Sequence, residues 1–70
     1  MKTNQDRCEE MEKIVDQSTL LDTLAALELM CYEKAAHIRE NWQDKALASQ
    51  WELCARAIYK ANLTVVKTNL

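Results

Sequence analysis

The sequence predicts an all-α protein: an antiparallel helical hairpin preceded by a short N-terminal helix and completed as a homo-oligomeric helix bundle. The chain has no glycine, proline or phenylalanine, so it lacks the usual residues of β-hairpin turns and phosphate-binding loops. Apolar residues recur at helical spacing along two long segments. One of these segments carries more apolar surface than a single neighbouring helix can cover. The 70 residues form one domain, whose core alone would supply only about 3–5 kcal/mol.

The first predicted helix covers residues 4–16. Thr3 followed by Asp6 matches a capping box, in which each of the two side chains satisfies a backbone N–H at the start of a helix. The helix has a thin apolar stripe made of Cys8, Met11, Ile14 and Val15. We therefore expect it to depend on a neighbouring surface for its stability.

The second predicted helix covers residues 19–41 and the third covers residues 44–61. Ser18 or Thr19 can cap the second helix, and Asp44 can cap the third. Asn41 tolerates the left-handed conformation that often follows a helix, so the turn is placed at residues 41–44. Asn62 is the expected C-cap of the third helix, and the tail 62–70 either extends this helix or packs back on the hairpin.

The two long helices carry matching apolar stripes, spaced by about 3.6 residues per turn. Folding the hairpin about residues 41–44 places Cys31 opposite Cys54, and we expect both in the core as small apolar side chains. The stripe of the second helix is Leu20, Leu24, Leu27, Cys31, Ala35, Ile38 and Trp42, and that of the third is Leu47, Trp51, Cys54, Ile58 and Ala61.

A second apolar strip on helix 19–41 predicts an interface with another copy, because one neighbouring helix cannot cover both strips. Glu28 and Arg39 lie close to this strip. They either pair with charges across the interface or extend to water at its edge. The predicted interface residues are Leu21, Ala25, Glu28, Leu29, Tyr32, Ala36 and Arg39.

Composition excludes several classes of protein. Three cysteines are an odd number, and without a secretory leader they indicate a reducing, cytoplasmic setting rather than a disulfide scaffold. The chain has no apolar run of about 20 residues that could span a membrane. The single histidine, His37, lies four residues after Glu33 on a polar face, which is typical of a surface pair. We therefore expect no metal, no cofactor and no enzymatic activity.

Basic residues on the third helix suggest two further ligands. Lys45, Arg56, Lys60 and Lys67 resemble the phosphate-binding face of small helical-hairpin dimers that bind RNA, such as the Rop family. The cations are sparse and Glu52 lies among them, so a solvated face is the preferred interpretation and nucleic-acid binding is disfavoured. The alternative is a nucleotide-type phosphorylated signal held between copies. Its candidate contacts are Arg39, Trp42, Arg56, Tyr59 and Lys60.

Residues 32–44, followed by Trp51 and Glu52, resemble short helical-hairpin proteins of phages and prophages. This resemblance implies a small accessory protein that binds and inhibits or regulates a larger protein partner. The leading functional hypothesis is therefore a non-enzymatic homo-oligomer that acts by binding.

Overall fold

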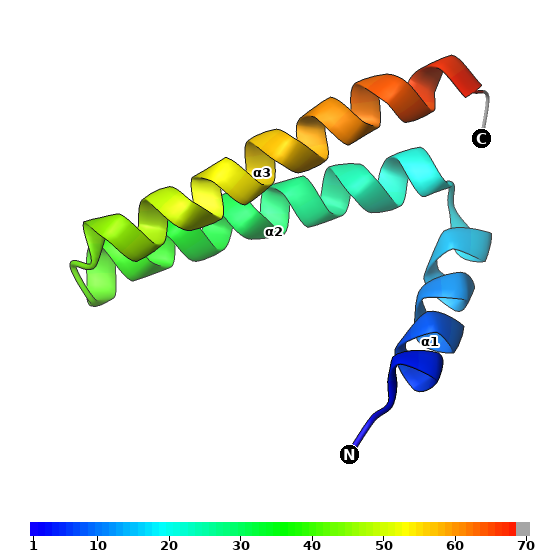
Figure 1. Cartoon of the computed structure of the whole chain (residues 1–70), viewed down its shortest axis with the longest axis horizontal. Coiled ribbons are helices and arrows are strands. Elements are labelled where there is room, and N and C mark those ends of the chain that lie inside the picture. Colours follow the sequence, from blue (N-terminus) through cyan, green and yellow to red (C-terminus); the bar gives the residue numbers. More distant parts are fainter. Residues whose placement is uncertain (69–70) are drawn as a thin grey trace.

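A computed structural model describes residues 1–68 as helical throughout apart from short connections, which confirms that the protein is all-α. The described part contains three α-helices and a C-terminal 3-10 turn. Figure 1 shows α2 and α3 side by side and running in opposite directions, with α1 leading away on the side of α2 opposite to α3. The elements are α1 (Asn4–Gln17), α2 (Leu20–Asn41), α3 (Lys45–Val65) and the turn Val66–Thr68.

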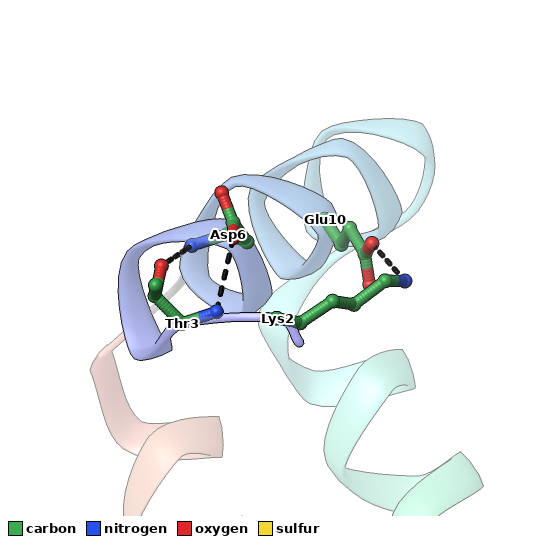
Figure 2. Close-up of polar contacts among 4 residues, drawn as sticks. All are labelled: Lys2, Thr3, Asp6 and Glu10. Carbon is green, nitrogen blue, oxygen red and sulfur yellow. Dashed lines mark hydrogen bonds and ion pairs between the residues drawn. The ribbon is translucent and has the colours of Figure 1, made fainter.

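Side-chain caps begin all three helices. Thr3 and Asp6 form the predicted capping box: the Asp6 N–H donates to Thr3 Oγ1 at 3.1 Å, and the Thr3 N–H donates to Asp6 Oδ2 at 3.0 Å (Figure 2). An ion pair between Lys2 and Glu10 lies beside it (Figure 2). Thr19 caps α2 and Asp44 caps α3. Since these caps satisfy N–H groups that no helical carbonyl can reach, they define where each helix starts.

Replacing Thr19 by alanine should lower the free energy of unfolding by about 1 kcal/mol. Thr19 Oγ1 accepts the Asp22 N–H at 3.0 Å, and alanine offers no acceptor at this site. Ser18→Ala is the matched control, because the Ser18 hydroxyl makes only long contacts of 3.4 and 3.5 Å to carbonyl oxygens. Urea unfolding of both variants tests this, and equal losses would contradict the assignment of the cap to Thr19.

The turn between α2 and α3 differs from the prediction, which placed a left-handed residue at Asn41. Gln43 has the positive φ, 53°, whereas Asn41 stays within α2. The Trp42 N–H still donates to the Ile38 carbonyl at 2.9 Å, so helical hydrogen bonding continues one residue beyond Asn41. The left-handed residue is therefore displaced toward Asp44, directly before the cap of α3.

The third helix continues beyond Ala61 to Val65, and a 3-10 turn follows. Of the two alternatives for the tail, the described part therefore extends the helix. Asn62 lies inside α3 and is half-buried rather than serving as the cap. Its side-chain oxygen is buried and lacks a hydrogen-bond partner among the described residues. Without glycine or proline to stop it, the helix extends for as long as its apolar side chains lie against α2. Residues 69–70 of the predicted tail lie outside the described part.

The seam between α2 and α3 is made of small side chains. Ala48 and Ala55 are 0% exposed, Ala35 is 1% exposed and Cys31 is 3% exposed. Small residues let two helix backbones approach closely, which leaves the bulkier apolar side chains at the edges of the seam.

The predicted stripe of α3 is consequently rotated. Cys54, Leu47 and Ala61 are exposed, so the prediction that Cys54 meets Cys31 in the core is wrong. The residues of α3 that turn toward α2 are Ala48, Trp51, Ala55, Ile58, Asn62 and Val65, which are buried or half-buried. The prediction placed Leu47, Cys54 and Ala61 in the stripe, whereas close packing buries Ala48 and Ala55.

Candidate interaction surface

Two contacts between α2 and α3 define opposite sides of the pair. On one side Arg39 forms an ion pair with Glu52. On the other side the Lys34 ammonium lies 5.5 Å from the centre of the Trp51 ring, within the range of a cation–π contact. A residue three, four or seven positions away from Arg39 or Glu52 along the same helix lies on the first side. A residue at the same intervals from Lys34 or Trp51 lies on the second side. We call the Arg39 side the strip face and the Trp51 side the elbow face.

The strip face contains the predicted interface residues. Leu21 and Glu28 are half-buried, while Ala25, Leu29, Tyr32, Ala36 and Arg39 are exposed. Leu29 is 59% exposed although it is a large apolar side chain. Tyr59 and Leu63 of α3 continue this face, since they follow Glu52 by seven and eleven residues, and both are exposed. The structure therefore leaves on this face a broad apolar surface that spans both helices.

Arg39 is already paired within the chain, a contact that the sequence analysis did not include. Its Nη1 and Nη2 atoms donate to the two carboxylate oxygens of Glu52 at 3.2 and 2.8 Å. These hydrogen bonds, with the Arg39 charge adding to them, hold the pKa of Glu52 below its ordinary value. They also raise the pKa of Arg39. Arg39 thus links α2 to α3 at the rim of the strip face.

The ion pair should make stability depend on pH in one direction. Because the folded state lowers the pKa of Glu52, the pair contributes its stabilisation above the ordinary glutamate pKa and loses it as pH falls through the folded value. The melting temperature of wild type should therefore exceed that of Glu52→Gln at pH 7, and the gap should close below pH 4.5, the ordinary value. A gap that stays constant across this range would contradict the role of the carboxylate.

The predicted phosphate-binding residues are only partly brought together. Arg56 and Tyr59 share the strip face with Arg39, whose guanidinium is engaged by Glu52. Trp42 lies in the turn between α2 and α3 and is 73% exposed. Lys60 is exposed on the outer side of α3. The five residues therefore form no common pocket.

A groove that the sequence analysis missed lies in the angle between α1 and α2, on the elbow face. Its volume is about 290 Å³. Met11 and Ile14 line it from α1, and both are exposed. The remaining lining residues are Ser18, Asp22, Thr23, Ala26, Leu27 and Met30. The signal in the sequence is Ala26 with Met30 one turn later, an apolar pair outside both predicted strips.

The exposed area is larger than that of a compact chain of the same mass. The chain exposes 5654 Å², whereas a compact monomer of 8.1 kDa would expose roughly 4,500 Å². Its radius of gyration of 14.1 Å likewise exceeds the roughly 11 Å of a compact chain of this length. The difference comes from the open angle at α1 and from large apolar side chains left outside a seam of alanines.

His37 does not pair with Glu33 as predicted. It contacts Asn41 instead, with Nδ1 3.1 Å from the Asn41 amide nitrogen, which also donates to the His37 carbonyl at 3.0 Å. Over residues 1–68 there is no group of three or more histidine, cysteine or acidic side chains placed to hold a metal ion. No helix of that same part is long and apolar enough to cross a membrane.

Comparison of the chain with protein-family models, with curated proteins and with solved structures finds no match.

Proposed function

We propose that the chain is a non-enzymatic binding protein that works as a homo-oligomer, with the strip face as the contact between copies. The observation that carries this proposal is that small apolar residues are buried while several large ones are exposed. The fully buried apolar residues of the seam are three alanines and a cysteine, whereas Leu29, Tyr32 and Leu63 remain exposed. An exposed apolar surface of this kind usually marks an interface.

Pairing two copies through the strip face would turn each α2–α3 hairpin into half of a four-helix bundle. The excess exposed area of about 1,150 Å² over a compact monomer is larger than the roughly 800 Å² that each partner buries in a standard interface. Burial of this area would supply the stabilisation that the alanine seam of one copy lacks.

The biological role that we propose is inhibition or regulation of a larger protein, as in the phage accessory proteins that residues 32–44 resemble. Trp42 supports a contact of this kind, because it projects from the turn with 73% of its surface exposed. Exposed tryptophans are enriched among the residues that dominate binding at protein interfaces. The turn also lies at the opposite end of the hairpin from α1 (Figure 1), so a partner bound there would leave α1 free.

Light scattering across a range of protein concentrations tests this proposal, with and without a mixed pool of nucleotides. We expect a dimer or higher oligomer whose mass is indifferent to nucleotides. A monomer at all concentrations would overturn the oligomer, because the strip face would then stay exposed in solution. A change in mass on adding nucleotides would instead favour a ligand held between copies.

A further inference from the structure

We propose that the groove between α1 and α2 receives α3 of a second copy, through the uncharged side of that helix. This inference rests on the proposed homo-oligomer and adds a second contact surface, separate from the strip face. We call the groove the elbow. The uncharged side, which we call the neutral flank, consists of Leu47, Gln50, Cys54, Ala57 and Ala61, all of them exposed.

The elbow lacks cover from the other described residues, 1–68. Every residue of α1 is exposed except Val15, which is half-buried. Met11 and Ile14, the apolar residues of α1 that line the groove, are 37% and 49% exposed. A helix of 14 residues is marginal on its own in water, because most helical stability comes from packing an apolar face. We infer that a surface outside residues 1–68 covers the stripe of α1.

The occupant must be a helix with an apolar, uncharged side, because the groove is lined mainly by alkyl and thioether groups. The neutral flank of α3 fits this requirement. Its residues recur at intervals of three and four, which keeps them on one side of the helix for four turns. The other exposed sides carry charges, since α1 is acidic on its outer side and the strip face includes Arg39 and Glu52. Of the surfaces in the described chain, the neutral flank is the one that would bury fewest charges.

Charge also favours α3 over another helix as the occupant. The α1 segment has five acidic and two basic residues, whereas α3 has three basic residues and one acidic residue. A basic helix lying along an acidic one gains from long-range attraction. Figure 1 shows α3 on the side of α2 away from α1, so α1 and α3 of one chain attract each other only weakly. In the proposed contact, α1 of one copy would lie beside α3 of the other.

The excess exposed area is larger than the area that one interface would cover. The excess of about 1,150 Å² is more than one standard interface removes from each partner, roughly 800 Å². The strip face and the elbow are on opposite sides of the α2–α3 pair, as the Arg39–Glu52 and Lys34–Trp51 contacts show. One copy can therefore be contacted at both surfaces.

Two complementary variants test this proposal in the full-length chain. Met30→Glu places a charge in the elbow, and Ala57→Glu places one on the neutral flank. Each should lower the average mass in light scattering and raise the dissociation constant by about tenfold or more, because a carboxylate is costly to bury without a partner. An equimolar mixture should recover a larger mass than either variant alone. In the mixture, the intact elbow of Ala57→Glu can bind the intact flank of Met30→Glu.

Ile14→Glu repeats the elbow test from α1, in case Met30→Glu fails to fold, and far-ultraviolet circular dichroism checks the helix content of every variant. Wild-type mass for Met30→Glu and Ile14→Glu would overturn the proposal. So would a mixture whose mass stays at the average of its two components, because the elbow would then be filled by something other than α3. The proposed homo-oligomer is tested separately with the strip-face variant Leu29→Glu. If this variant kept the wild-type mass, the proposed contact through the strip face would be wrong.

Discussion

Replacing Ala55 by leucine is expected to lower the free energy of unfolding by about 1–3 kcal/mol. Ala55 is 0% exposed and lies in the seam between α2 and α3. A leucine there would push the two helix backbones apart along the alanine seam, since close-packed interiors accept added methylene groups only with strain. Urea unfolding at one fixed protein concentration measures the loss.

Ala46→Leu is the matched control, because Ala46 belongs to the same helix and is exposed. Its effect should stay within about 0.5 kcal/mol. If Ala55→Leu were as stable as this control, α2 and α3 would have to be separated by a looser seam than the buried alanines indicate.

Leu29→Glu is expected to break the proposed contact between copies. Leu29 is 59% exposed on the strip face, and a glutamate there would place a charge in the proposed interface. We expect the dissociation constant to rise by about tenfold or more, equivalent to roughly 1.4 kcal/mol. Since binding to the folded state stabilises it, the melting temperature should fall by roughly 5–10 °C at the same concentration.

Leu53 offers a close control for this experiment. It is also 59% exposed, but it lies on the side of α3 that turns away from α2. Leu53→Glu should therefore leave the mass and the melting temperature nearly unchanged. Equal effects of the two substitutions would mean that the strip face has no special role in association.

The helix starts could be predicted from sequence because they depend on local chemistry. Thr3, Thr19 and Asp44 each accept an N–H three residues ahead, and this spacing is visible in the sequence. The helix ends were less predictable. A left-handed residue at Gln43 rather than Asn41 depends on how the two long helices meet, which is a tertiary effect.

The contacts between helices could be predicted only in part. That the second strip would stay outside one hairpin followed from the number of apolar positions, and the structure leaves Leu29 and Tyr32 exposed. The rotation of α3 about its axis did not follow, because Ala48 and Ala55 differ little in hydrophobicity from Cys54 and are selected by their small size. The pairing of Arg39 with Glu52 depends on that rotation.

The elbow could not be predicted, because it depends on the direction of one short connection. Ser18 has φ −137° and ψ −116°, which ends α1, and Thr19 then starts α2 with its own cap. These two residues direct α1 away from the α2–α3 pair (Figure 1). Periodicity shows which side of a helix is apolar but carries no information about the angle at such a break.

The short connection between α2 and α3 has a consequence for the order of events during folding. Only residues 42–44 separate the two helices, so their contacts need little loop closure and the relative contact order is low. Helical hairpins of this kind form in microseconds to milliseconds, whereas the meeting of two chains is slower and depends on concentration. In the proposed oligomer, each newly made chain would therefore complete its hairpin alone and meet another copy with its apolar faces already arranged.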